Sequence, residues 1–186
     1  MLKKEFIIDN DIVLREISLN DVPSIFTAID NEREYLGEWL PFVDYTREAD
    51  DTRAVVGEMI ASSDKNLTFS IQFQKSFAGL IGLKDFDFIN KKTEIGYWLS
   101  EKYQHKGIIT KSCEALIEYA FEELDMYRIQ LNAAAGNKKS QAVAERLGFT
   151  KEGVMRSAEL HSRGFLDIVV FGLLKPDWKN RNKWLS

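Results

Sequence analysis

A polar turn with one glycine lies between an apolar, strand-like segment and an amphipathic, helix-like segment, and its residue types suit phosphate binding. The turn covers residues 104–107, ends at Gly107, and leads into a helix expected from Ile108. The first N–H groups of a helix have no partner within it and lie at the positive end of its dipole. Gly107 has no Cβ to hold an anion away, and Lys102 and Lys106 add positive charge. The turn therefore predicts an anion site, and we expect a pyrophosphate.

Two other phosphate motifs can be tested directly against the sequence. A Walker loop needs G-x-x-x-x-G-K-[ST], and a dinucleotide fold needs G-x-G-x-x-G directly after its first strand. Neither pattern occurs. The turn is therefore a phosphate loop of another kind or an ordinary strand–loop–helix connection.

Two segments carry a resemblance to a known family. Q-H-K-G-I-I, from Gln104 to Ile109, resembles the Q/R-x-x-G-x-G/A acetyl-CoA loop of the GNAT N-acetyltransferase superfamily, although Ile109 replaces its glycine or alanine. One strand and one helix later, N-K-K-S from Asn137 and L-G-F ending at Phe149 are similar to the family's N-x-x-S…LGF segment. Both motifs occur in the family's order and at its spacing.

Within that superfamily the chain is similar to the Rim type, which acetylates the N-termini of ribosomal proteins. The likeness is carried by EIGYWL, by YQHKGIITKSCEALIEYAF and by LGF…EG…RSAEL. The resemblance covers residues 10–175 and is most specific over residues 94–159.

The resemblance implies which residues hold acetyl-CoA. In the family the asparagine contacts the pantetheine arm, and the serine hydroxyl lies near the thioester sulfur. The strand before the turn is also implied to splay from the strand over residues 128–135, so that the pantetheine inserts between them. The cofactor-binding residues are then Trp98, Leu99, Ser100, Gln104, His105, Lys106, Gly107, Ile108, Ile109, Thr110, Asn137 and Ser140.

The chemistry follows from the two expected substrates, a thioester and an amine. A thioester is already activated, so the enzyme must deliver a neutral amine, hold the carbonyl and protonate the departing thiolate. An α-amine with a pKa near 8 costs about 1.4 kcal/mol to deprotonate at pH 7, whereas a lysine amine costs about 4.6 kcal/mol. An α-amine can therefore manage with a carboxylate that acts through water.

Three residues are candidates for the catalytic roles. Glu159 matches the glutamate that is proposed as the base in Rim-type enzymes, and Glu94 lies on the strand where several GNAT enzymes place a base. Either glutamate could instead be a surface carboxylate at a strand end. Ser140 could protonate the leaving thiolate, but a serine in the first turn of a helix is also an ordinary capping residue.

Composition indicates the general class of protein but does not specify its function. The 186 residues are 45% apolar and 29% charged, which describes one ordinary globular domain over residues 1–186. No apolar run reaches the ~20 residues of a membrane span, and no signal peptide is recognisable, so we expect a cytoplasmic protein without a membrane partner. The single cysteine, Cys113, excludes an internal disulfide, and with His105 and His161 it makes a zinc site improbable, so no metal is expected.

The net charge of −4 argues against nucleic-acid binding by the whole chain, because such binding depends on neutralising phosphates. An early acidic cluster could attract a basic substrate or could simply be a solvated helix surface. Its members are Asp30, Glu32, Glu34, Glu38, Asp44, Glu48, Asp50 and Asp51. The expected partners are acetyl-CoA and a basic protein or peptide N-terminus, such as that of a ribosomal protein, with a homodimer as a further assembly to consider.

The apolar patterns predict an α/β protein. Strands are expected at residues 12–17, 67–74, 78–88, 93–100, 128–135, 151–162 and 165–174, and helices at 18–33, 34–40, 46–62, 108–124 and 137–147. The resemblance implies a GNAT fold: a single mixed, mostly antiparallel central sheet of about seven strands, helices on both faces, and a splayed strand pair that holds acetyl-CoA.

The predicted function is acetyl-CoA-dependent transfer of acetyl to a primary amine, with the N-terminal α-amine of a ribosomal protein as the preferred acceptor. A polyamine, an aminoglycoside or another small amine is an alternative acceptor, for which a deep acidic pocket would be expected. A non-catalytic acetyl-CoA sensor is a third possibility, against which Ser140 and Glu159 argue.

Overall fold

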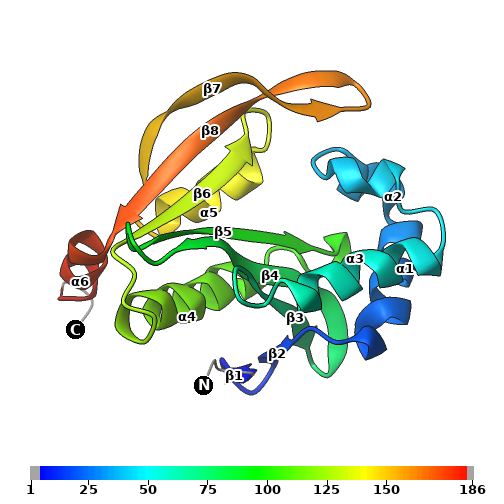
Figure 1. Cartoon of the computed structure of the whole chain (residues 1–186), viewed down its shortest axis with the longest axis horizontal. Helices are drawn as coiled ribbons and strands as arrows, with labels where there is room; N and C mark the ends of the chain where they lie inside the picture. The colour runs from blue at the N-terminus through cyan, green and yellow to red at the C-terminus, as the bar shows by residue number, and fades with distance from the viewer. Residues whose placement is uncertain (1–4, 184–186) are drawn as a thin grey trace. The chain divides into compact units, whose positions relative to one another are not determined.

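The computed structural model describes residues 5–183, in which eight strands form one sheet in the order β1-β2-β3-β4-β5-β6-β8-β7 (Figure 1). β5 and β6 pair in parallel, whereas β1 with β2, β2 with β3, β6 with β8 and β7 with β8 pair antiparallel. The expected mixed, mostly antiparallel sheet is confirmed, with eight strands where about seven were predicted. The strands are β1 (Glu5–Ile7), β2 (Ile12–Glu16), β3 (Leu67–Phe73), β4 (Ser76–Asp87), β5 (Lys92–Leu99), β6 (Arg128–Ala134), β7 (Thr150–His161) and β8 (Gly164–Leu174).

Helices separate the strands along the chain. They are α1 (Val22–Asn31), α2 (Arg33–Gly37), α3 (Ala49–Ala61), α4 (Ile108–Glu122), α5 (Lys138–Arg146) and α6 (Lys175–Lys183), with short 3-10 helices η1 (Leu19–Asp21), η2 (Pro41–Asp44) and η3 (Glu101–Tyr103). In the described part of the chain, none of these helices has the length and apolar character needed to cross a membrane.

The chain forms two compact units, and β4, β5 and α4 contribute residues to both. The first unit comprises residues 1–82 and 97–112, described here from residue 5. Its apolar core joins α1, α2 and α3 to the strands. The core residues are Ile17, Val22, Ile25, Ile29, Leu36, Val43, Val56, Leu80 and Trp98.

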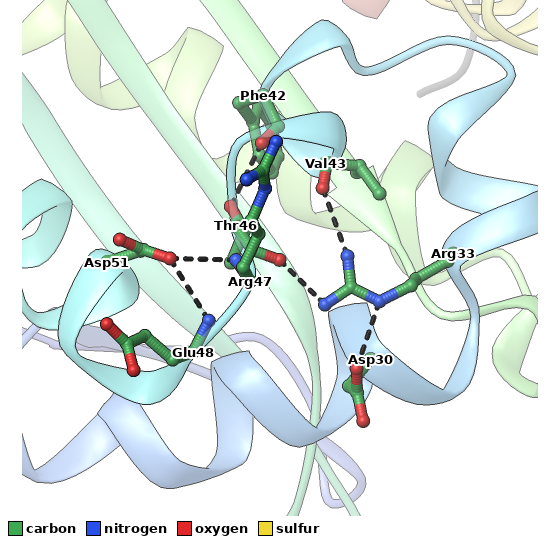
Figure 2. A network of polar contacts seen from close by, with 8 residues as sticks. All are labelled: Asp30, Arg33, Phe42, Val43, Thr46, Arg47, Glu48 and Asp51. Atoms are coloured by element: carbon green, nitrogen blue, oxygen red, sulfur yellow. Dashed lines mark hydrogen bonds and ion pairs between the residues drawn. The ribbon is translucent and has the colours of Figure 1, made fainter.

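In the first unit, the segment between α2 and α3 is fastened by charged side chains (Figure 2). Arg33 donates hydrogen bonds to the carbonyl oxygens of Val43 (3.1 Å) and Thr46 (2.7 Å), and its Nε lies 2.9 Å from Asp30 Oδ1. Because one guanidinium holds two backbone carbonyls, the path of η2 is fixed relative to α2.

Helix α3 begins at Ala49, whereas the sequence predicted a helix from residue 46. Glu48 is the N-cap, and the Asp51 carboxylate accepts hydrogen bonds from the backbone N–H groups of Arg47 (2.8 Å) and Glu48 (3.0 Å). These bonds lower the pKa of Asp51. The Thr46 hydroxyl instead donates to the carbonyl of Phe42 (3.0 Å).

The second unit comprises residues 83–96 and 113–186, described to residue 183. Its buried apolar residues come from α4, β6 and β8 and include Leu116, Ile117, Phe121, Ile129, Leu131, Phe171 and Leu173. β8 lies between β6 and β7, so the β7–β8 hairpin adds β7 at the sheet edge. In the described register, β5 pairs with β6 only from Lys92↔Arg128 to Glu94↔Gln130, although both strands continue. This early end of the pairing is what a splayed strand pair requires.

Candidate active site

The turn between β5 and α4 has an unusual backbone that glycine makes possible. His105 (φ +60°) and Gly107 (φ +73°) both adopt left-handed conformations on either side of Lys106, and α4 begins at Ile108 as predicted. A Cβ added at Gly107 would meet no atom within 4 Å, so the need for glycine comes from its φ angle and not from crowding. Exposed N–H groups at the start of a helix, with open space beside them, fit a bound anion.

Lysines surround this turn. Lys102 Nζ lies 5.0 Å from the centre of the Tyr103 ring, and Lys106 Nζ lies 5.8 Å from the centre of the Phe73 ring. Lys111, one turn into α4, forms an ion pair with Asp9 (2.6 Å), which lowers the pKa of the Asp9 carboxyl. The positive charges therefore lie on the same segment as the helix N-terminus.

The end of β5 offers its main chain more readily than its side chains. The Trp98 indole is buried in the core of the first unit and packs edge-on against Phe77 at 5.7 Å. A Cβ at Gly79 would lie 2.1 Å from the Trp98 carbonyl oxygen, so glycine is required for this close approach. Ser100 is buried, and its N–H donates to the Ala78 carbonyl (2.8 Å). The Trp98 indole and Ser100 are therefore enclosed, whereas Leu99 is half-buried.

The first turn of α4 places Ile108 inside the protein, whereas Ile109 and Thr110 are half-buried. Ile109, the departure from the family pattern, therefore keeps part of its side chain at the surface.

The predicted asparagine and serine lie together at the start of α5. Asn137 is the N-cap, and its side-chain oxygen accepts a hydrogen bond from the backbone N–H of Ser140 (3.0 Å). The capping role therefore belongs to Asn137, and Ser140 takes part through its main chain. The Ser140 hydroxyl is not needed for this cap.

Glu94 is engaged by two neighbours. One carboxylate oxygen lies 2.8 Å from Lys84 Nζ, and the other accepts a hydrogen bond from Asn132 Nδ2 (2.8 Å). The side chain is 17% exposed. Both oxygens therefore already have partners.

Glu159, in contrast, is 41% exposed near the end of β7 and lies 3.2 Å from Nε2 of the buried His161. The other ring nitrogen of His161, Nδ1, is buried and has no hydrogen-bond partner among the described residues. The Glu159 carboxylate can therefore reach solvent while its contact with the buried His161 ring restrains its position.

Asp167 is a residue that sequence reasoning missed. Between Met155↔Ile168 and Glu159↔Leu166, β7 has three residues where β8 has one, which is a bulge directly before Glu159. Ser157 in the bulge has φ +49°, and its N–H donates to the Asp167 carboxylate (2.8 Å). The Asp167 carbonyl accepts the N–H of Ala135 (2.8 Å), two residues before Asn137. Asp167 therefore connects the segment that leads to Glu159 with the segment that leads to Asn137 and Ser140.

The predicted site residues are thus divided between the units. Those from Trp98 to Thr110 belong to the first unit, and Glu94, Asn137, Ser140 and Glu159 belong to the second. Within residues 5–183, no three histidine, cysteine, aspartate or glutamate side chains gather into a group that could hold a metal ion.

Comparison with known proteins identifies the family. The acetyltransferase (GNAT) domain matches residues 11–150, which is most of the chain. The protein YdaF of Bacillus subtilis (strain 168) is 35% identical over 175 residues, which cover 92% of this chain and 96% of YdaF. The chain belongs to the GNAT acetyltransferase family, and it is an acetyl-CoA-dependent N-acetyltransferase.

Two further similar proteins are named as ribosomal-protein acetyltransferases. The ribosomal-protein-serine acetyltransferase of Escherichia coli (strain K12) is 26% identical over 166 residues. These residues cover 88% of this chain and 93% of the Escherichia coli protein. A structure of RimL, a ribosomal L7/L12 α-N-protein acetyltransferase in complex with coenzyme A, superposes with a TM-score of 0.86 at 27% identity over 90% of this chain and 96% of the other. The GNAT fold and the coenzyme A chemistry predicted from the sequence are therefore confirmed.

Proposed function

We propose that this enzyme acetylates the N-terminal α-amine of a basic protein, with a ribosomal protein as the acceptor. The observation that carries the proposal is the half-exposed Glu159 carboxylate on β7, held beside His161. The ribosomal-protein acetyltransferases among the similar proteins support the same acceptor class. Ribosomal proteins are made in the cytoplasm, and we assign the reaction to that compartment.

The energetics of deprotonation favour this acceptor. Deprotonating an α-amine at pH 7 costs about 1.4 kcal/mol, whereas deprotonating a lysine-like amine costs about 4.6 kcal/mol. A carboxylate that acts through a water molecule can therefore serve an α-amine more easily. Glu159 serves as that base in the proposal. Glu94 is the weaker candidate, because Lys84 and Asn132 occupy its two oxygens.

The remaining roles follow the same proposal. The Gln104 N–H already donates to the Glu101 carbonyl (3.0 Å), so the N–H groups of residues 105–110 are the ones that bind the pyrophosphate. The backbone of Trp98 and Leu99 and the side chain of Asn137 contact the pantetheine arm, and the Ser140 hydroxyl donates a proton to the leaving thiolate. The left-handed backbone of the exposed Gly107 and the capping geometry of Asn137 support these assignments.

A small polyamine is a less suitable acceptor, because several members of the acidic cluster already have partners within the chain. Asp30 pairs with Arg33, and Asp51 caps α3. Glu32 accepts the backbone N–H of Glu101 (2.8 Å). These carboxylates are used to hold the structure and are not all available to attract a cation.

Matched peptides test the acceptor. A basic peptide with a free N-terminus, the same peptide with a blocked N-terminus, spermine and an aminoglycoside are each incubated with acetyl-CoA, and released coenzyme A is measured. We expect turnover only with the free N-terminus. Robust turnover of spermine, with none on the free-N-terminus peptide, would reject the protein acceptor while leaving the family assignment intact. Mass spectrometry of ribosomal-protein N-termini from cells with and without the enzyme then identifies the acceptor.

A further inference from the structure

The start of α2 contacts η3 and the first residue of the proposed phosphate loop within the first unit. The backbone N–H of Glu101 donates to Glu32 Oε2 at 2.8 Å, and Gln104 Nε2 donates to the Tyr35 hydroxyl. Each pair joins residues 69 positions apart in the sequence. The two bonds therefore tie one short stretch, at the start of α2, to another, at the start of the loop.

These bonds fasten both ends of η3. Glu101 is the first residue of this 3-10 helix, and its N-cap residue, Ser100, makes no side-chain capping bond. The Glu32 carboxylate supplies that cap from another element. Gln104 is the C-cap residue of η3 and directly precedes the left-handed His105. The Tyr35 hydroxyl thus restrains the last residue before the loop enters its unusual conformation.

We propose that Glu32 and Tyr35 are positioning residues for the acetyl-CoA pyrophosphate loop. The inference rests on the proposed binding of the pyrophosphate by the N–H groups of residues 105–110. Left-handed backbone is unfavourable at a non-glycine residue, so His105 keeps this conformation only if its surroundings hold it. A loop that is already in place binds its ligand without a further ordering cost.

We call the two hydrogen bonds made by Glu32 and Tyr35 the brace. Helix α2, at which both begin, is itself held in place by its neighbours. Leu36, next to Tyr35, is buried in the core of the first unit, and Arg33, next to Glu32, holds the carbonyls of Val43 and Thr46 (Figure 2). Burial raises the pKa of Tyr35, so its hydroxyl remains protonated and neutral at physiological pH.

Removing the charge of Glu32 should change coenzyme A affinity in opposite directions according to simple electrostatics and according to our proposal. A carboxylate near an anionic pyrophosphate repels it, so Coulomb's law alone predicts tighter coenzyme A binding when this charge is removed. The brace predicts the opposite, because removal of the carboxylate leaves the Glu101 N–H without its partner.

The test measures coenzyme A affinity by calorimetry for Glu32→Ala and Tyr35→Phe. We expect each variant to bind about 2- to 10-fold more weakly, as the loss of one hydrogen bond predicts. Glu34→Ala is the matched control, since it removes the same charge from the exposed side of α2. Its affinity should be unchanged or slightly higher.

Two further measurements separate positioning from general structural damage. S-acetylpantetheine has the thioester and the pantetheine arm but no pyrophosphate, so its kcat/KM should be unchanged in both variants. In a Gln104→Ala background, Tyr35→Phe should have no further effect on coenzyme A affinity.

The outcomes are distinguishable. If the wild-type enzyme binds coenzyme A no more tightly than pantetheine, the pyrophosphate assignment itself fails. If the wild-type enzyme shows that preference and Glu32→Ala and Tyr35→Phe keep it, the brace is wrong. Equal losses with acetyl-CoA and S-acetylpantetheine would also overturn it. Tyr35→Phe changes only one hydroxyl, so it keeps the test decisive if Glu32→Ala does not fold.

Discussion

At the scale of single residues, Ser140 can be tested without disturbing its helix. Asn137 caps α5 through the Ser140 backbone N–H, which alanine retains. If the Ser140 hydroxyl donates to the leaving thiolate, Ser140→Ala should lower kcat on the order of 10- to 1000-fold and leave coenzyme A affinity nearly unchanged. Ser140→Thr, which keeps a hydroxyl, should retain more activity. A kcat equal to that of the wild type would remove Ser140 from the chemistry.

Glu159 has a distinctive dependence on pH. Glu159→Gln should bind the acceptor peptide but lose most activity at pH 7, where an α-amine with a pKa near 8 is mostly protonated. As the pH rises to 9 the free amine becomes abundant, so the deficit relative to wild type should shrink. Rates from pH 6.5 to 9 measure this. Glu152→Gln is the control on the same strand, because Glu152 pairs with Arg128. A deficit that stays constant over this range contradicts a role as base.

The residue types at the site and the contacts between near neighbours could be predicted from the sequence, but the contacts between strands could not. Asn137 and Ser140 are three positions apart at a helix start, so their contact follows from local geometry. The contact of Ser157 with Asp167, and that of Glu94 with Asn132, depend on strand register, which no local pattern fixes. Three-dimensional partners of this kind become visible only in the folded chain.

At the scale of elements, the bulge in β7 should control where Glu159 lies. Asp167→Ala removes the acceptor of the Ser157 N–H and leaves a left-handed serine unsupported. The bulge should then relax, and kcat/KM should fall by about 10-fold or more, because small displacements of a catalytic group are costly. Asp167→Asn keeps an acceptor oxygen and should lose less. Hydrogen exchange at Ser157 should accelerate in the alanine variant; unchanged exchange and unchanged kcat/KM would together refute the assignment.

Element positions were largely predictable, and the misses have physical causes. The β6 prediction differs from the structure by one residue at its C-terminal end, and the α5 prediction by one residue at each end, because their apolar periods are regular. β1 was missed because three residues show no reliable alternation. The β7 bulge was missed because Ser157 takes a left-handed conformation without a glycine to signal it. The helix expected from residue 46 begins later, at Ala49, because the Asp51 carboxylate accepts the N–H groups of Arg47 and Glu48.

At the scale of the whole molecule, the order of the strands in the sheet was not predicted from the sequence. Nothing local indicates that β8 lies between β6 and β7, or that the pairing of β5 with β6 ends at Glu94. Both features depend on long-range pairing, which sequence spacing does not determine. The resemblance implied only that β5 splays from β6, and in the structure their pairing stops before either strand ends.

Cys113 is the single thiol of the chain and reports on the stability of the fold. Burial raises the pKa of this thiol, and the neighbouring Glu114 adds to the shift. The folded thiol therefore stays protonated, whereas an unfolded thiol ionises near pH 8.5. The unfolded state then binds fewer protons above that pH, so the free energy of unfolding should fall as pH rises beyond about 8.5. Denaturant titrations at pH 7.5 and 9.5 measure this, and Cys113→Ala should show a smaller fall.

The same thiol makes cofactor binding measurable without turnover. Because only an opened chain exposes Cys113, labelling by iodoacetamide at pH 8 should follow the population of that opened state. Acetyl-CoA, which has no free thiol, at about 100 times its Kd should slow labelling by about 100-fold, equal to about 2.7 kcal/mol of added stability. Gly107→Ala places a Cβ at φ +73°, which disfavours the loop, so acetyl-CoA should protect this variant much less relative to its own unliganded rate. Protection that is equally strong in Gly107→Ala would mean that the loop before α4 does not hold the cofactor. No protection in the wild type would mean that Cys113 is exposed by a local opening of α4, which cofactor binding does not oppose.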